Sequence, residues 1–312
     1  MASILDDLKY TWRKPNSVMA RLILVNVFVF VLVGIINVFS SPEFFWLFFQ
    51  NLAMPTSLLE GSAGGMGYIS PLIHKPWTFF TAFFTHKGFG HILWNMLAFY
   101  WFGMVIRDFM GDRKLLSLYF LGGIVGSISM IVLFNLIPRF SDATYGLGWG
   151  ASAAVFAIMV AAATKFPDYQ FNLLFIGPVK LKYSALVMIF LSFIGLKGSN
   201  VGGEVAHLAG AVMGFIYIKQ LNNGTDLGRP ILIVSDFIME LFKPKPKIKV
   251  THRSGSKWAS KKSSKKGRNA ESSNLADPPQ EEIDAILDKI SQSGYDSLTT
   301  DEKQKLFNAS NK

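Results

Sequence analysis

The chain has 312 residues and contains no cysteine, which excludes disulfide bonds, thiol nucleophiles and cysteine-ligated metal sites. Its five histidines are scattered along the sequence, so a multi-histidine zinc site is not expected, and we predict no metal or other cofactor. Only 17% of the residues are charged, which is too few for an ordinary soluble enzyme. Any catalysis must therefore use oxygen and imidazole groups.

Apolar residues make up 50% of the chain, and Phe alone occurs 28 times. They gather in six runs, which predict an all-α, polytopic membrane protein with a bundle of six transmembrane helices. The runs cover residues 19–39, 91–106, 115–136, 151–164, 183–196 and 205–218. Several of them are shorter than the roughly 20 residues that usually cross a bilayer.

Basic residues near the ends of these runs indicate the orientation of the chain in the membrane. One side carries Lys9, Arg13, Lys14, Arg21, Arg107, Arg113, Lys114, Lys165, Lys180, Lys182 and Lys219, and the other side carries Lys75, Lys87, Arg139 and Lys197. By the positive-inside rule, this distribution places both termini in the cytoplasm. No organelle-targeting presequence is evident, so we expect a multi-pass protein of a bacterial inner, or plasma, membrane.

Four regions follow from these patterns: a cytoplasmic N-terminus (1–18), the membrane domain (19–220), a linker (221–276) and a small helical hairpin (277–312). In the linker, residues 229–242 have the apolar spacing of a helix that lies on a membrane. Residues 243–268 then hold eleven Lys or Arg and no acidic residue, which is typical of a disordered tether attracted to anionic lipid headgroups. Nucleic-acid binding is not expected, because neither a binding fold nor an aromatic stacking surface accompanies this charge.

The last residues show the pattern of two short helices. Asp277 and Pro278 open the first helix, Gly294 ends it, and Thr299 with Glu302 forms a capping box for the second. The apolar face of the first helix consists of Ile283, Ile286, Leu287 and Ile290. A unit of this size is too small to carry much stability alone, so we expect it to dock on a protein partner or on the membrane domain.

Two polar side chains stand near the beginning of apolar runs. Ser152 follows a glycine-rich turn, and His207 opens the sixth run about fifty residues later. Fourteen residues of helix are about 21 Å long, against roughly 30 Å of hydrocarbon, so a run that begins at residue 151 places Ser152 roughly 10 Å below the outer surface. The same arithmetic places His207 at a similar depth. A nucleophile and a base at one level indicate hydrolysis at the membrane.

The two runs also carry small residues that favour close packing. These are Ala153, Ala157 and Ala161 after the serine, and Ala206, Gly210 and Gly214 around the histidine. Small residues at four-residue spacing let membrane helices approach closely, so Ser152 could reach His207. The alternative is that the small residues only help to pack a bundle of any function.

His91 and Asn95 lie four residues apart and therefore on one face of the second predicted helix. Turned toward Ser152, they could donate hydrogen bonds to an oxyanion, together with the Ser152 amide. The alternative is a polar clamp between helices. Glu204 precedes His207 by three residues, but we expect it to cap a helix start and face water rather than to form a third catalytic member.

The chain resembles the rhomboid intramembrane serine proteases over residues 77–215. The resemblance depends on His86, His91, Asn95, Gly103, Gly111, Gly150, Ala151, Ser152, Ala206, His207, Gly210 and Gly214. It implies an intramembrane serine endopeptidase that acts on transmembrane protein substrates, cutting in or next to their transmembrane segments. Ser152 would then be the nucleophile and His207 the base of a dyad, with His91 and Asn95 in the oxyanion hole. Gly150, Phe156, His86 and Gly210 would support the site.

The chain departs from this family at Ala153 and Phe156, where the family commonly has Gly and Tyr. Phe156 can still stack on His207 without the hydroxyl. The main alternative function is a catalytically inactive relative that binds or chaperones transmembrane segments. A transporter or channel ranks lower, because charged residues are scarce inside the apolar runs.

Overall fold

A computed structural model describes residues 17–58, 62–64, 67–137, 146–173, 177–242 and 280–310. The chain divides into two compact units, residues 1–245 and residues 246–312. The whole basic stretch at 243–268 and the helix start at Asp277 lie outside the described residues, as does most of the predicted N-terminal region.

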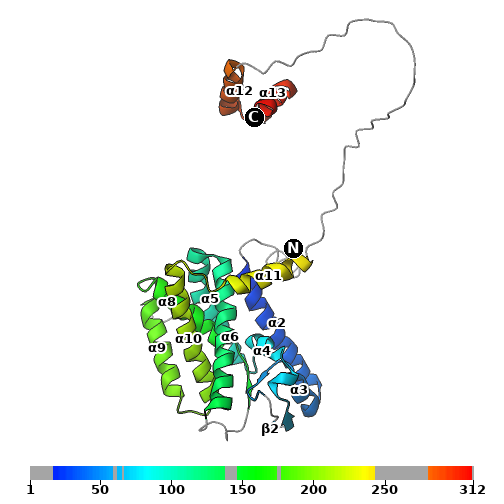
Figure 1. Ribbon diagram of the computed structural model, residues 1–312, viewed down its shortest axis with the longest axis vertical. Helices are drawn as coiled ribbons and strands as arrows, with labels where there is room; N and C mark the ends of the chain where they lie inside the picture. The colour runs from blue at the N-terminus through cyan, green and yellow to red at the C-terminus, as the bar shows by residue number, and fades with distance from the viewer. Residues whose placement is uncertain are drawn as a thin grey trace, which may run out of the picture. The chain divides into compact units, whose positions relative to one another are not determined.

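The first unit is a helical bundle (Figure 1). Its six main helices are α2 (Val18–Phe39), α5 (Phe89–Met110), α6 (Asp112–Leu136), α8 (Ser152–Lys165), α9 (Leu181–Gly195) and α10 (Val201–Asn222). Each overlaps one of the six apolar runs. Within the described part of the chain, α2, α5, α6 and α10 are long and apolar enough to cross a membrane, whereas α8 and α9 are shorter apolar helices. The predicted helical membrane protein is confirmed at this level, and six crossings remain a prediction.

Two helices extend well past the apolar runs. Helix α5 continues to Met110, and α10 begins at Val201, four residues before its run. The apolar run at 205–218 begins after the start of α10 because Gly202, Gly203 and Glu204 are not apolar, although they still adopt helical backbone geometry. His207 consequently lies in the second turn of α10 rather than at its first residue.

Helix α8 occupies the centre of the bundle and packs against α5, α6, α9 and α10. All its residues from Ala153 to Ala163 are buried. The predicted stripe of small residues is confirmed at its contact with α10, because a Cβ atom at Gly210 would overlap the carbonyl oxygen of Ala153, and one at Gly214 would overlap that of Ala157. Glycine at these two positions lets the backbones of α8 and α10 approach each other closely.

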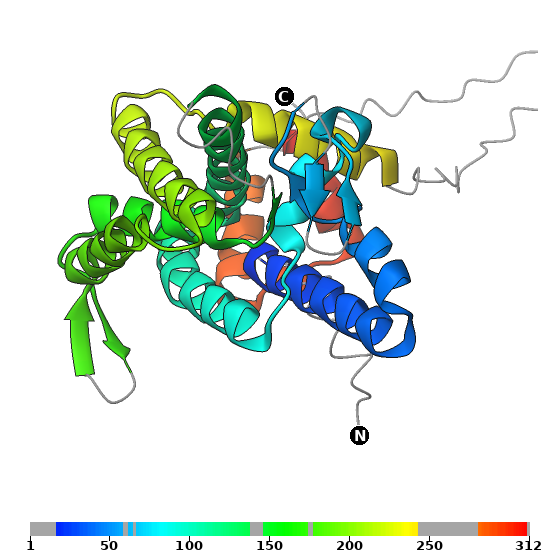
Figure 2. The same cartoon turned by 90° about the horizontal axis from the view of Figure 1, so that it is seen from below.

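Three short antiparallel strand pairs were not expected in an all-α protein. Strand β1 (Met54–Pro55) pairs with β4 (Leu147–Gly148), β2 (Ser62–Gly64) pairs with β3 (Gly67–Ile69), and β5 (Gln170–Leu173) pairs with β6 (Gly177–Lys180). Strands of two to four residues are too short to show an alternating apolar pattern, so the sequence did not reveal them. The β5/β6 ribbon projects from the bundle between α8 and α9 (Figure 2).

The long first loop between α2 and α5 contains short helical segments. They are α3 (Pro42–Phe49), η1 (Leu72–His74), α4 (Thr78–Thr81) and η2 (Ala82–Phe84). Phe45 and Phe49 of α3 pack in a cluster with Val33 of α2, and the ring of Trp149 contacts Phe49 edge to face at 5.4 Å. The β1/β4 pair then joins this loop to the segment that leads into α8. The loop thereby supports the backbone just before Ser152.

Helix α11 (Arg229–Phe242) has the bounds that the sequence predicted. Arg113 of α6 donates two hydrogen bonds, of 2.9 and 2.8 Å, to the carboxylate of Asp236 on α11. Leu232 is buried against the bundle. The other side of α11 exposes the apolar residues Ile233, Val234, Phe237, Ile238, Met239 and Leu241. An amphipathic helix thus lies against the same end of the bundle as the start of α6.

The second unit is the predicted helical hairpin. It contains α12 (Gln280–Ser293), η3 (Tyr295–Ser297) and α13 (Thr300–Ser310), with Gly294 at a φ of 78° after α12. The capping box is confirmed, because the Thr299 amide donates to Glu302 Oε2 at 2.7 Å and the Glu302 amide donates to Thr299 Oγ1 at 3.4 Å. Hydrogen bonds from Lys289 and from Thr299 lower the pKa of Glu302 to about 2. The carboxylate therefore stays ionised in all but strongly acidic solution.

Candidate active site

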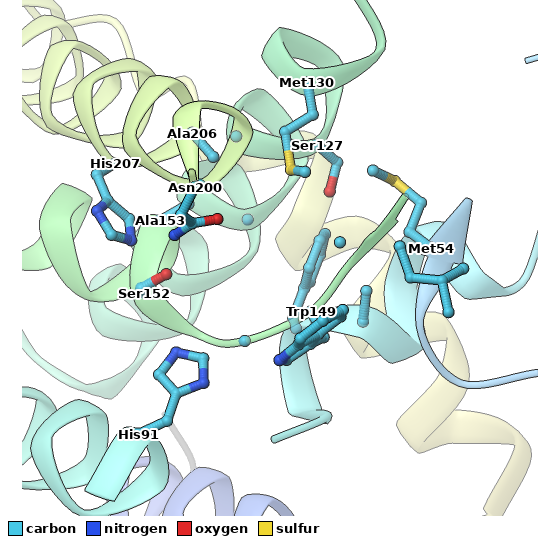
Figure 3. A pocket seen from close by; sticks show the side chains of 18 residues that line it. Met54, His91, Ser127, Met130, Trp149, Ser152, Ala153, Asn200, Ala206 and His207 are labelled. Carbon is cyan, nitrogen blue, oxygen red and sulfur yellow. The ribbon is translucent and has the colours of Figure 1, made fainter. Parts of the chain in front are cut away.

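A cavity of about 390 Å³ contains both Ser152 and His207. Helices α5, α6, α8 and α10, together with β4, supply its walls. Figure 3 shows Ser152 below His207, with His91 facing the serine from the opposite wall. The structure thus brings together three of the side chains that the sequence singled out.

Ser152 is the first residue of α8 and follows a sharp turn at Gly150. Gly150 has a φ of +115°, a conformation that favours glycine, and a Cβ atom there would lie 2.7 Å from Cε1 of His91. Its amide donates to the carbonyl of Ala82 at 2.9 Å, which anchors the turn to η2. Amides in the first turn of a helix have no partner within that helix, so the Ser152 amide is available as a donor at the cavity.

His207 is held by three neighbours. Its ring stacks on Phe156 of α8, with centroids 4.6 Å apart and an interplanar angle of 7°. Its Nδ1 atom lies 3.0 Å from Oγ of Ser192 and 3.1 Å from Oε2 of Glu204. Nε2 is therefore the ring nitrogen left to act on Ser152.

Ser152 and His207 are not hydrogen-bonded to each other in the described structure, although both line the same cavity. Catalytic hydrogen bonds are often long before substrate binds and shorten in the reacting complex. The arrangement can therefore support proton transfer after a small movement of either side chain.

His86 lies just before α5 and is fully buried. The amide of Ala151 donates to its Nε2 at 3.4 Å, and its ring lies 5.1 Å from that of His91. Burial and the neighbouring His91 lower the pKa of His86 to about 4. His86 is consequently neutral near pH 7 and can accept the hydrogen bond that holds the backbone before Ser152.

Asn95 is buried one turn after His91, and its side-chain amide donates to the carbonyl of His91 at 2.8 Å. It does not belong to the cavity lining, whereas His91 does. An amide group carries two N–H donors, so one donor of Asn95 is committed to its own helix.

Two neighbours of His207 differ from what the sequence led us to expect. We expected Glu204 to cap the start of α10, but the cap of α10 has no side-chain hydrogen bond and the Glu204 carboxylate contacts His207 instead. The carboxylate can lie toward the imidazole one turn along because Gly195 of α9 has no side chain in its place. Ser192 on α9 was missed, since a single hydroxyl in an apolar run carries no signal.

The methyl group of Ala153 fits because both neighbouring helices have glycine opposite it. A Cβ atom at Gly126 of α6 would overlap the Ala153 methyl group, and one at Gly210 would overlap the Ala153 carbonyl. The bundle thus leaves room for alanine after the nucleophile. Gly210 has this packing role, one turn after His207.

Comparisons with known proteins show which families the sequence is similar to. Residues 74–222 match the model of the rhomboid domain. This range of the chain contains Ser152, His207, His91 and Asn95. Residues 278–312, which contain the hairpin, match the model of a family of unknown function, DUF6576. The two matches fall in different structural units of the chain.

Three relatives illustrate the similarity. RHOMBOID-like protein 12, mitochondrial, of Arabidopsis thaliana is 30% identical over 158 residues, which cover 47% of this chain and 47% of that protein. Rhomboid protein 1, mitochondrial, of Saccharomyces cerevisiae is 31% identical over 43% of this chain and 38% of its own length. Putative rhomboid protease YdcA of Bacillus subtilis is 27% identical over 55% of this chain and 79% of its own length. The chain spans less than half the length of the first two relatives.

Proposed function

The chain is a rhomboid family protein through its domain at residues 74–222, and from this premise we propose that it is a serine endopeptidase. It hydrolyses peptide bonds in or next to the transmembrane segments of other membrane proteins. The main support for this proposal is that Ser152 and His207 line the same cavity. Nδ1 of the imidazole contacts Ser192 and Glu204, so Nε2 is the nitrogen that can take the proton of Ser152. The name of the Bacillus subtilis relative, putative rhomboid protease YdcA, agrees with it.

In this mechanism Ser152 Oγ attacks the carbonyl carbon of the scissile bond while Nε2 of His207 takes the hydroxyl proton. The tetrahedral intermediate collapses, the C–N bond breaks, and the imidazolium gives its proton to the leaving amine. A water molecule then attacks the acyl-enzyme, His207 takes a proton from that water, and the proton finally returns to Ser152 Oγ. No group outside the cavity is required to balance these steps.

The oxyanion that forms in each half-reaction needs hydrogen-bond donors. His91, Asn95 and the Ser152 amide are the groups that we assign to this role. His91 lines the cavity opposite Ser152 (Figure 3). Asn95 lies one turn farther along the same helix, where its second N–H is available after a modest side-chain rotation.

Alanine at His91 is expected to lower kcat by about 10²-fold, because one donor to the oxyanion is lost. The measurement is steady-state cleavage of a single-span substrate by protein reconstituted in liposomes. KM should change little, since the donor contributes in the transition state rather than in substrate binding. An unchanged kcat would remove His91 from the proposed oxyanion hole.

The protein reconstituted in liposomes tests the proposed function directly. A fluorophosphonate probe is expected to label the wild-type protein at Ser152, and a substrate with a small residue near the outer membrane surface is expected to be cleaved. The matched control is Ser129→Ala, which removes another serine hydroxyl from the bundle, one that donates to the Gly126 carbonyl. A folded protein that neither reacts with the probe nor cleaves would instead be the non-catalytic binder of transmembrane segments.

We also propose that all six apolar helices cross the membrane and that both termini face the cytoplasm. The lysine and arginine distribution supports this orientation. A bacterial inner membrane stays a prediction, because relatives named as mitochondrial match this chain as well as the one from Bacillus subtilis does. Labelling of single introduced cysteines from either side of a sealed vesicle tests the topology, since the natural chain has none.

Anionic lipid is the partner that we propose for α11 and the basic segment at 243–268. The apolar face of α11 supports this, since Val234, Phe237 and Leu241 are all exposed. Eleven lysine and arginine residues follow it without an acidic residue, and each contributes about 1 kcal/mol of attraction near an anionic surface. The hairpin at 277–312 is proposed to bind a protein partner.

Trypsin is expected to cut the basic segment several-fold more slowly in nanodiscs of anionic lipid than in nanodiscs of neutral lipid. Trypsin cuts after lysine and arginine, and these side chains of the basic segment would lie at the anionic headgroups, where the protease reaches them less easily. Salt at about 1 M, where the Debye length is about 3 Å, should abolish the difference. Equal cutting rates in the two kinds of nanodisc at low salt would contradict lipid binding.

A further inference from the structure

The side of His207 that faces away from the cavity is contacted by two polar residues from two helices. Ser192 comes from α9 and Glu204 from α10, and their oxygen atoms lie 3.0 and 3.1 Å from the same ring nitrogen, Nδ1. Ser192 is 4% exposed, and the side chains of His207 and Glu204 are 17% and 19% exposed. These contacts therefore lie in a partly buried setting, where hydrogen bonds to charged groups are strong.

The two contacts have different consequences for the proton on the imidazole. A serine hydroxyl can donate or accept a hydrogen bond, so Ser192 is compatible with either neutral tautomer of His207. An ionised carboxylate can only accept, so Glu204 requires a proton on Nδ1. That tautomer leaves the lone pair on Nε2, the nitrogen that would take the proton of Ser152.

The charge on Glu204 also matters once His207 has taken that proton. An imidazolium inside a protein of low dielectric constant is costly unless an opposite charge lies nearby. Glu204 supplies this charge at 3.1 Å, whereas Ser192 is neutral. The carboxylate therefore stabilises the state that forms during the attack more than it stabilises the neutral resting state.

The neighbouring helix is shaped to admit this carboxylate. A Cβ atom at Gly195, the last residue of α9, would lie 2.8 Å from Cδ and 3.0 Å from Oε1 of Glu204. Because Gly195 has no side chain, the Glu204 side chain can fold back along α10 toward His207. Phe156 covers the face of the imidazole, so the ring is held at its face and at Nδ1.

We propose that Glu204 is a positioning residue for His207, which completes a Ser152–His207–Glu204 relay, and that Ser192 Oγ supports it by accepting from the same Nδ1–H. The proposal rests on the proposed serine endopeptidase function. It goes beyond a two-residue dyad by assigning to Glu204 the choice of tautomer and the stabilisation of the imidazolium.

The test compares Glu204→Gln, Glu204→Asp and Ser192→Ala with the wild-type protein in liposomes. Glu204→Gln is expected to lower kcat by about 10²-fold or more with KM nearly unchanged, because an amide neither fixes the tautomer nor balances the imidazolium charge. The rate of fluorophosphonate labelling should fall in parallel. Glu204→Asp keeps a carboxylate and should recover a large part of kcat, and Ser192→Ala should lose less than about 10-fold, since one neutral hydrogen bond is removed.

One control variant and the wild-type protein itself separate this role from a structural one and from failure of the proposed function. Glu43→Gln removes an exposed carboxylate on α3 and should leave kcat and KM unchanged. Wild-type activity in Glu204→Gln would overturn the relay and leave the endopeptidase assignment intact. Equal losses in Gln and Asp, with a raised KM and a lowered melting temperature, would also overturn it in favour of a packing role. If the wild-type protein itself neither cleaves nor labels, the proposed function fails first, and the relay fails with it.

Discussion

Alanine at Ser152 is expected to abolish cleavage of a single-span substrate, with a loss of at least about 10³-fold in kcat. The hydroxyl is the nucleophile that attacks the peptide bond in the proposed mechanism, and alanine leaves the first turn of α8 intact. Alanine at His207 is expected to have an effect of similar size, because the mechanism assigns the transfer of the serine proton to its imidazole. Liposome cleavage assays and fluorophosphonate labelling measure both losses.

The double substitution should be no worse than either single one, since the two residues act as a unit and their effects are not additive. Each variant must keep the melting temperature of the wild-type protein, which separates lost chemistry from lost folding. Retained cleavage in Ser152→Ala or in His207→Ala would disprove the assignment of that residue, whatever the family resemblance.

Valine at Gly214 is expected to lower the free energy of unfolding by about 3 kcal/mol or more, at the upper end of the range for overpacked cores. A Cβ atom at Gly214 would overlap the carbonyl oxygen of Ala157, so α10 must move away from α8. Backbone atoms cannot move aside as the end of a flexible side chain can. The measurement is equilibrium unfolding in mixed detergent micelles.

The control for this substitution is Gly34→Ala on α2, because a Cβ atom at Gly34 meets nothing within 4 Å. Alanine there should leave stability unchanged or raise it slightly, since alanine favours a helix more than glycine does. If Gly214→Val were as stable as the wild-type protein, the close approach of α8 and α10 would not depend on this glycine.

Much of the fold could be predicted from the sequence because helix formation in this chain follows local hydropathy. All six apolar runs became helices, and α11 has the predicted bounds. The capping box of Thr299 and Glu302 was also predictable, since its two hydrogen bonds join residues three apart. The β-strand pairs were not predictable. Strands β1 and β4, for example, pair with each other across about ninety residues of sequence, and each has only two residues.

The candidate site also contains residues whose positions were predictable from the sequence and residues whose positions were not. The spacing of glycine and other small residues, with Ser152 and His207 near the starts of two apolar runs, was enough to predict that these two residues would lie close together, and both line one cavity. Glu204 was noticed and misjudged, because its position near a helix start fits both a cap that faces water and an inward hydrogen bond to His207. Asn95 was predicted to face the cavity, but its amide donates to the carbonyl of its own helix.

The sequence was sufficient to predict which segments are helical and which of their faces can pack closely, and the common depth of Ser152 and His207 in the membrane stays a prediction. These properties depend on hydropathy and on spacing along a single helix. The surroundings of His207 depend instead on tertiary packing, because Phe156, Ser192 and Glu204 come from three different helices. Their contacts depend on how α8, α9 and α10 are rotated about their axes. That rotation follows from the packing of Gly210 and Gly214 against the backbone of α8 and of Gly195 against the Glu204 side chain.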